Sequence, residues 1–260
     1  MLTEEAAAPR SYRVLGVRIH AVQIPDVIDM IERWIEESER CRYIAVTDMH
    51  GVSVAGQDPD FRRILEEADL VVPDGMPLVW LGRSRGHALE RRVYGPELML
   101  EFCRRTRGRG YRHYFYGGRP GVAARLVETL RAIDVGLQVG GTFSPPFGTP
   151  SRQESEETVA RINKASPDIL WVGLGAPKQE RWMWENRARL RVPVLVGVGA
   201  AFDINSGQVR QAPVWMRENG LEWSWRLMLE PRRLWRRYLI DGSRFAANVA
   251  LELSGLRRFD

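Results

Sequence analysis

The sequence predicts an α/β fold with a doubly wound, largely parallel sheet, followed by a C-terminal helical appendage. Short apolar runs alternate along the chain with stretches of helical periodicity, which is the pattern of strand–helix–strand units. Glycine clusters follow several of these runs, as expected where parallel strands end beside a ligand. Beyond Gly207, arginine and tryptophan become frequent, so the last part of the chain is predicted to be separate from the sheet.

Five short apolar runs are predicted as strands, over residues 43–47, 69–73, 113–116, 169–172 and 193–198. Helices are predicted between or after them, over residues 58–68, 96–107, 120–132, 154–165 and 179–190. The first of these helices has Asp58 as its cap and Pro59 at its first helical position, where these residue types are favoured. Strands that alternate with helices in this way predict a Rossmann-like sheet.

The change of composition divides the chain into four predicted regions. They are a flexible N-terminus over residues 1–11, an α/β catalytic domain over 12–208, an Arg/Trp-rich helical appendage over 209–244 and a C-terminal tail over 245–260. Pro231 interrupts the appendage and is expected to start a new helix.

The composition is that of a globular protein with a basic surface. Of the 260 residues, 44% are hydrophobic and 27% are charged, and the formal net charge is +5, with arginine as the main basic residue. The basic excess indicates phosphate-rich ligands, anionic membrane or nucleic acid, without choosing among them. Cys41 and Cys103 lack metal-site spacing and are expected to be core thiols in a reducing compartment. With neither a leader pattern nor a membrane-spanning run visible, we expect a cytoplasmic protein.

Glycine-rich loops follow three of the predicted strands. Gly117 and Gly118 follow one strand, Gly173 and Gly175 follow the next, and Gly199 follows the last. Such glycines let backbone N–H groups approach a diphosphate at a helix N-terminus. They are equally compatible with ordinary tight turns, so the residues themselves leave both interpretations open.

Two polar residues follow predicted strands and are candidates for chemistry. Asp74 ends a buried strand, where a carboxylate can accept a proton from a substrate hydroxyl; the alternative is an Asp-Gly turn or a helix cap. His50 follows the first strand and either lines the same edge or is a structural histidine. The segment 58–60 has the form of an Asp-x-Asp metal motif, but its place before a helix favours capping. No metal site is predicted.

Three arginines of the appendage are spaced seven and three residues apart, at Arg226, Arg233 and Arg236. On one continuous helix they would share a face, although Pro231 stands between the first and the second. Arginine interleaved with tryptophan suits a helix at a membrane interface. It equally suits a solvated face that packs on the α/β domain.

Four segments carry longer motifs: residues 68–75 (ADLVVPDG), 91–98 (RRVYGPEL), 173–180 (GLGAPKQE) and the block 197–238, which ends in RLMLEPRRLWRRY. In this order they resemble the WecG/TagA/CpsF family of bacterial glycosyltransferases. The resemblance implies transfer of a sugar, often N-acetylmannosamine, from a UDP-sugar to a polyprenyl-diphosphate-linked saccharide in cell-surface polysaccharide or teichoic-acid-type assembly. It also implies inversion at the anomeric carbon, no obligatory metal, no cofactor, and a peripheral location at the inner face of the cell membrane.

The resemblance also implies roles for individual residues. Asp74 corresponds to the proposed base, and Thr47 and Arg92 to further active-site residues. Gln179 corresponds to a glutamine that contacts the substrate.

The appendage arginines Arg226, Arg233 and Arg236 correspond to residues suggested to engage the acceptor diphosphate. One position departs from the family: many members have an asparagine where this chain has Met49, followed here by His50. Either His50 takes over a polar role or the chain uses a different sugar. We expect the appendage to close over the site when the lipid-linked acceptor is met.

A different class of protein is also compatible with these features. A non-catalytic, nucleotide-binding scaffold of a polysaccharide assembly complex would keep the sheet and the glycine loops. A nucleic-acid partner is not expected, because only the basic charge favours it and the usual motifs are lacking. The sequence is compatible with a homo-oligomer but does not determine the oligomeric state.

Overall fold

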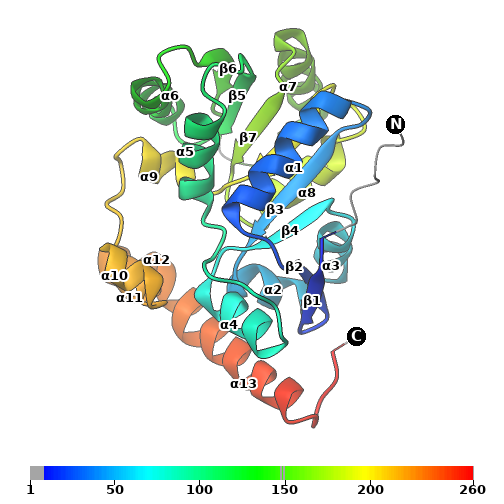
Figure 1. The fold of residues 1–260 in the computed structure, drawn as a ribbon, viewed down its shortest axis with the longest axis vertical. Coiled ribbons are helices and arrows are strands. Elements are labelled where there is room, and N and C mark those ends of the chain that lie inside the picture. Colours follow the sequence, from blue (N-terminus) through cyan, green and yellow to red (C-terminus); the bar gives the residue numbers. More distant parts are fainter. Residues whose placement is uncertain (1–8, 147, 149, 260) are drawn as a thin grey trace.

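The protein is built on a six-stranded sheet with helices on both faces (Figure 1). The computed structural model describes residues 9–146, 148 and 150–259. The strands of this sheet are β3 (Arg42–Thr47), β4 (Leu70–Pro73), β5 (Arg112–Gly117), β6 (Gln138–Phe143), β7 (Ile169–Gly173) and β8 (Val194–Gly197). They are arranged in the order β4-β3-β8-β7-β5-β6, and every neighbouring pair is parallel. The predicted doubly wound, parallel α/β fold is therefore confirmed.

Alternate residues of each strand point to opposite faces, and each face has its own hydrophobic core. One core packs against α1 (Ile24–Glu37), α5 (Gly95–Arg105), α6 (Val122–Ile133) and α9 (Ala201–Asn205). The other packs against α2 (Met49–Ala55), α3 (Pro59–Glu66), α4 (Met76–Ser84), α7 (Arg152–Ala165) and α8 (Lys178–Asn186). Both faces are thus covered, which explains why the central strands are apolar throughout.

All five predicted strands and all five predicted helices are present, with their ends shifted by a few residues. The elements of the α/β domain that we did not predict are the hairpin β1 (Ser11–Val14) and β2 (Val17–His20), the strand β6, and the helices α1, α2, α4 and α9. β6 escaped prediction because it is an edge strand with two glycines and only partial burial. It therefore lacks the apolar run that marks the central strands.

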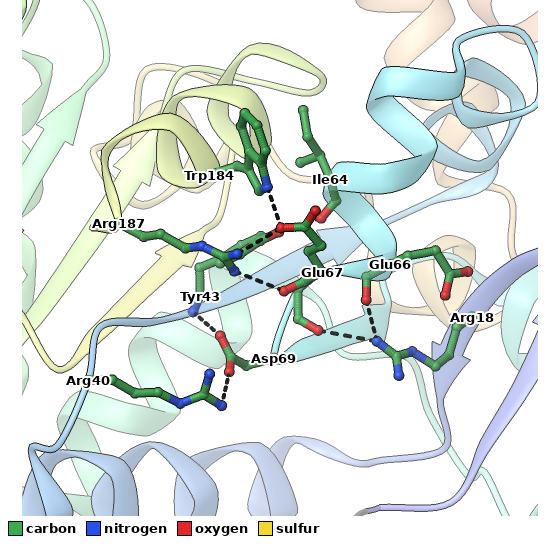
Figure 2. Close-up of polar contacts among 10 residues, drawn as sticks. Arg18, Arg40, Tyr43, Ile64, Glu66, Glu67, Asp69, Trp184 and Arg187 are labelled. Carbon is green, nitrogen blue, oxygen red and sulfur yellow. Dashed lines mark hydrogen bonds and ion pairs between the residues drawn. The ribbon is translucent and has the colours of Figure 1, made fainter. Parts of the chain in front are cut away.

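At the N-terminal ends of β3 and β4, a polar network around Glu67 and Asp69 holds neighbouring segments together (Figure 2). The Glu67 carboxylate accepts hydrogen bonds of 2.8 Å from both Trp184 Nε1 and Arg187. Asp69 accepts from the backbone N–H of Tyr43 at 3.0 Å and forms an ion pair with Arg40. These contacts fasten the segment between α3 and β4 to α8 and to the start of β3.

The C-terminal part folds into α10 (Val214–Glu218), α11 (Glu222–Leu229), α12 (Pro231–Trp235), the π-helical turn η1 (Arg236–Asp241) and α13 (Gly242–Leu253). Pro231 begins α12, as expected. The predicted boundary after residue 244 falls inside α13, which packs against α2. Phe245 is buried in the core together with residues of α2 and α4. Most of the predicted flexible segment 1–11 lies outside the described residues, and Ser11 already belongs to β1.

Candidate active site

The predicted catalytic residues meet at the C-terminal edge of the sheet. Thr47 is the last residue of β3 and Asp74 follows the last residue of β4. Because these strands are neighbours in register, the backbone N–H of Asp74 donates to the carbonyl oxygen of Thr47 at 2.9 Å. The Thr47 side chain is buried at this junction. Parallel pairing thus brings together two residues that are 27 positions apart in the sequence.

Asp74 has the electrostatic character of a general base that titrates near neutral pH. Its Oδ1 atom is buried and has no hydrogen-bond partner among the described residues. Burial raises the pKa of Asp74 to about 8, and the nearby charges of Asp48 and Glu222 act in the same direction. Arg92 and Arg226 oppose this rise. A carboxyl group with such a pKa in a pocket can exchange a proton at physiological pH.

Arg92 lies beside Asp74 but is held by a residue of the appendage. One guanidinium nitrogen donates to the backbone carbonyl of Asp74 at 3.2 Å. The other terminal nitrogen forms an ion pair with the carboxylate of Glu222, on α11. The guanidinium also stacks 4.0 Å from the centroid of the Tyr94 ring, and the Tyr94 hydroxyl donates to Glu222 at 3.2 Å. Neither Glu222 nor Tyr94 was predicted from the sequence.

A second ion pair joins the appendage to the same edge. Asp48 Oδ1 caps α2 by accepting from the backbone N–H groups of His50 and Gly51, and its Oδ2 pairs with Arg237 at 2.5 Å. Burial alone would raise the pKa of Asp48, but Arg237 and these hydrogen bonds hold it at about 2. Arg237 belongs to the π-helical turn η1, a feature that often occurs at functional sites.

The two residues that depart from the family pattern lie beside this ion pair. Met49 contributes to the pocket that contains Asp74. His50 is half-buried, with its Nδ1 atom 3.6 Å from a carboxylate oxygen of Asp241. Burial lowers the pKa of His50, and the charge of Arg237 adds to this effect. The structure therefore places His50 near the predicted edge, facing the appendage.

Two cavities adjoin at this edge and share Met76, Arg92 and Arg217. The smaller has a volume of about 90 Å³ and contains Asp74, Arg92, Glu222 and Arg226. The larger has a volume of about 370 Å³ and lies between α4, the segment before α5, and α10. Its polar wall consists of Arg83, Glu90, Arg91, Glu97, Glu218 and Asn219, with Trp80 on the α4 side.

The predicted glycine loops lie on the same edge, farther along the sheet. Gly117 and Gly173 end the adjacent strands β5 and β7 and are paired in register. A Cβ atom on Gly117 would be 2.5 Å from the carbonyl oxygen of Gly173, and the φ of Gly117 is +127°, so this position requires glycine. The chain leaves β5 toward α6 on one face and β7 toward α8 on the other. Ligands of doubly wound sheets bind at such a switch point.

Gln179 is engaged inside the protein. Its Oε1 atom accepts from the backbone N–H of Gly199 at 2.9 Å, and its Nε2 atom donates to Glu180 at 2.8 Å. The side chain is only 2% exposed. Gln179 thus holds the loop after β8 against α8, and a direct contact with a substrate stays a prediction. Gly175, in the loop between β7 and α8, has a φ of +78° and an open environment.

The structure separates the three appendage arginines. Arg226, on α11, lines the pocket that contains Asp74. Arg233 and Arg236 are exposed: the first pairs with Glu230 and the second stacks on Trp235. Because α11 ends before Pro231, the three do not share one continuous helix. The arginine that reaches the site from α12–η1 is Arg237, the residue after the predicted Arg236.

Among the described residues, no group of three or more His, Cys, Asp and Glu side chains is placed to hold a metal ion. None of the described helices combines the length and apolar character that crossing a membrane requires.

A doubly wound sheet with a carboxyl group and glycine loops at its C-terminal edge has the arrangement in which α/β enzymes bind their ligands. The chain belongs to the WecG/TagA/CpsF family of glycosyl transferases, whose sequence profile matches residues 12–258. It is therefore a glycosyltransferase, as the sequence motifs predicted.

Two curated relatives are similar over most of their length. The chain is 31% identical to the N-acetylglucosaminyldiphosphoundecaprenol N-acetyl-beta-D-mannosaminyltransferase of Bacillus spizizenii strain W23, over 71% of this chain and 70% of that protein. It is 27% identical to the protein of the same name from Bacillus subtilis strain 168, over 89% of this chain and 88% of that protein.

Proposed function

We propose that the protein transfers an N-acetylmannosamine-like sugar or another hexose from a UDP-sugar to a polyprenyl-diphosphate-linked saccharide. The observation that carries the proposal is Asp74, whose carboxyl group has a pKa of about 8 and a buried oxygen with no partner among the described residues, at the edge where the two cavities meet. The names of the relatives supply the chemistry: a mannosaminyl group and a diphosphate-linked acceptor.

In this mechanism Asp74 removes the proton from the acceptor hydroxyl as that oxygen bonds to the anomeric carbon of the donor. The bond from the anomeric carbon to the UDP oxygen breaks on the opposite side, so the configuration inverts. The β-linked products in the names of the relatives agree with inversion of an α-linked donor. Positive groups near the breaking bond, such as Arg226 and backbone N–H groups of the glycine loops, stabilise the leaving diphosphate. The proposed reaction requires no metal ion.

The strand order supports separate places for the two substrates along the edge. Asp74 follows the edge strand β4, and the glycine loops follow β8, β7 and β5 on the other side of β3. We place the UDP group over the switch point between β5 and β7. The acceptor then approaches from the β4 side, where the 370 Å³ cavity offers carboxylates, guanidinium groups and the ring of Trp80 to a saccharide.

We further propose that the protein works at the inner face of the cell membrane, because its acceptor is lipid-linked. Exposed apolar side chains gather on the appendage, including Trp215 at 60%, Met228 at 66% and Leu239 at 52% exposure. Arginine is interleaved with them, as is typical of interfacial helices. Closure of the appendage on the acceptor would act through α11 and η1, which already contact the site.

The test is release of UDP from several UDP-sugars in the presence of a short-chain lipid-diphosphate N-acetylglucosamine, for the wild type and Asp74→Asn. Loss of a general base costs about 10²–10⁴-fold in rate, so we expect Asp74→Asn to lose at least about a hundredfold in kcat. Turnover should persist after EDTA treatment. Full turnover by the variant would remove Asp74 from the mechanism. A wild type that binds UDP but transfers no sugar from any donor would favour the scaffold alternative.

A further inference from the structure

We infer that Glu222 is a positioning residue of the transfer reaction: it holds Arg92 away from the carboxylate of Asp74, so that this carboxylate stays available as a base. The inference rests on the proposed function. It assigns a task in the active site to a side chain that the appendage supplies from 148 positions beyond Asp74.

Glu222 contacts Arg92 and Tyr94 at the same time. Its two carboxylate oxygens bond different partners, Oε2 the guanidinium of Arg92 and Oε1 the hydroxyl of Tyr94. The Tyr94 ring in turn lies against the face of that guanidinium. The side chains of Arg92 and Glu222 are only 14% and 11% exposed, so water screens the pair weakly. Three groups therefore fix the orientation of Arg92.

This orientation decides what Arg92 does to Asp74. The hydrogen bond from Arg92 to Asp74 goes to the backbone carbonyl, while Asp74 Oδ1 is left unpaired within the described residues. A guanidinium so close would otherwise form a bidentate pair with the carboxylate, its preferred geometry. Such a pair would favour the ionised carboxylate and weaken it as a base. Glu222 supplies the competing carboxylate.

Docking of the appendage is a different task, and the chain offers a control for it. Glu252, on α13, pairs with Arg85 at 2.8 Å and accepts from the backbone N–H of Leu15 at 3.1 Å. This pair joins α13, the helix that begins in the appendage and runs beyond residue 244, to the α/β domain, and it lies outside both cavities. If Glu222 mattered only for docking, neutralising Glu252 should have a similar effect.

The experiment measures kcat, KM and the pH dependence of kcat/KM for Glu222→Gln, Arg92→Gln, the double variant and Glu252→Gln, with thermal unfolding of each. The wild type is assayed first, because a wild type without transferase activity would count against the proposed function rather than against Glu222. We expect Glu222→Gln to lose about 10- to 100-fold in kcat, the cost of a misplaced catalytic group. Glu252→Gln should stay within about threefold of the wild type, a margin smaller than one catalytic contact.

Two further readouts separate positioning from a merely structural role. The double variant should be no slower than Arg92→Gln, because Glu222 acts through Arg92. The acidic limb of kcat/KM for Glu222→Gln should move to lower pH. The charged and titratable groups that face Asp74 include Arg92, Tyr94, Asp48, Glu222, Arg226 and Arg237. Glu222→Gln removes one of the negative charges that raise the pKa of Asp74, and it frees Arg92 to approach the Asp74 carboxylate.

Additive losses in the double variant, or an unmoved acidic limb, would overturn the inference. So would a Glu222→Gln enzyme as fast as the wild type. If Glu222→Gln unfolds, Glu222→Asp keeps the charge on a shorter side chain that reaches Arg92 less well. It should show a smaller loss in kcat in the same direction, and unchanged kcat in that folded variant would equally contradict a positioning role.

Discussion

At the scale of single residues, the buried carboxyl of Asp74 couples stability to pH. Burial raises its pKa in the folded protein to about 8 from an ordinary value of 3.8. Folding therefore favours the protonated form, and the stabilisation is complete below about pH 4 and is lost as the pH rises toward 8. Asp74→Asn removes this loss. We expect the melting temperature of the variant to rise relative to that of the wild type as the pH increases from about 4 to 8. Above about pH 8 the difference between the two melting temperatures should stay constant.

Differential scanning fluorimetry of the two proteins across this pH range checks the expectation. All other titratable groups are shared, including Glu180, whose pKa burial raises to about 7, so the difference isolates Asp74. A gap that narrows with rising pH would mean that the arginines around Asp74 outweigh its burial.

Residues at strand ends could be predicted from the sequence, whereas their partners could not. Thr47 and Asp74 each end an apolar run, and parallel pairing then brings them together. The ion pairs of the site, which involve Glu222, Asp48 and Arg237, join residues up to 189 positions apart. Local sequence patterns do not predict pairs at such distances. Gln179 could be located but not its two internal hydrogen bonds.

At the scale of elements, α3 and α8 are held together by the network in Figure 2. Glu67 accepts from Trp184 and Arg187, which both belong to or follow α8. Glu67→Ala should lower the free energy of unfolding by about 1–2 kcal/mol, because it removes two hydrogen bonds at a partly exposed site. Urea unfolding measures this, with Glu185→Ala, an exposed position on α8, as the control. Equal stabilities of the two variants would show that water replaces these contacts at no cost.

Elements with apolar runs or clear caps were predictable, and elements that depend on tertiary contacts were not. The helix α3 begins with Asp58, whose side chain accepts from the backbone N–H of Phe61 as a cap should. β6 and the hairpin β1–β2 are short strands whose stability comes from pairing and from burial against neighbours. The extension of α13 beyond residue 244 depends similarly on the packing of Phe245.

At the scale of the whole molecule, the strand order could not be derived from the sequence, yet it organises the site. Alternating strands and helices predict a parallel sheet in many possible orders. The observed order places Asp74 at the β4 end and the glycine loops over β8, β7 and β5. The appendage contributes Glu222, Arg226 and Arg237 to the same C-terminal edge. The site is thus shared by regions that the sequence presents as separate.

The apolar surface of the appendage leads to a prediction about the molecule as a whole. Leu229 and Leu239, with 48% and 52% exposure, lie on α11 and η1 among arginines that can contact lipid phosphates. Replacing both by serine should weaken partition onto phosphatidylglycerol vesicles by about tenfold or more, given about 25 cal/mol for each Å² of apolar surface withdrawn from water.

Val135 is more exposed, at 82%, but lies between α6 and β6, away from the appendage, so Val135→Ser should bind as the wild type does. Cosedimentation at several salt concentrations measures the electrostatic and the apolar contributions to binding separately, because the arginine contribution weakens with salt and the apolar contribution does not. Equal binding by the double variant and the wild type would place the membrane-facing surface elsewhere on the protein.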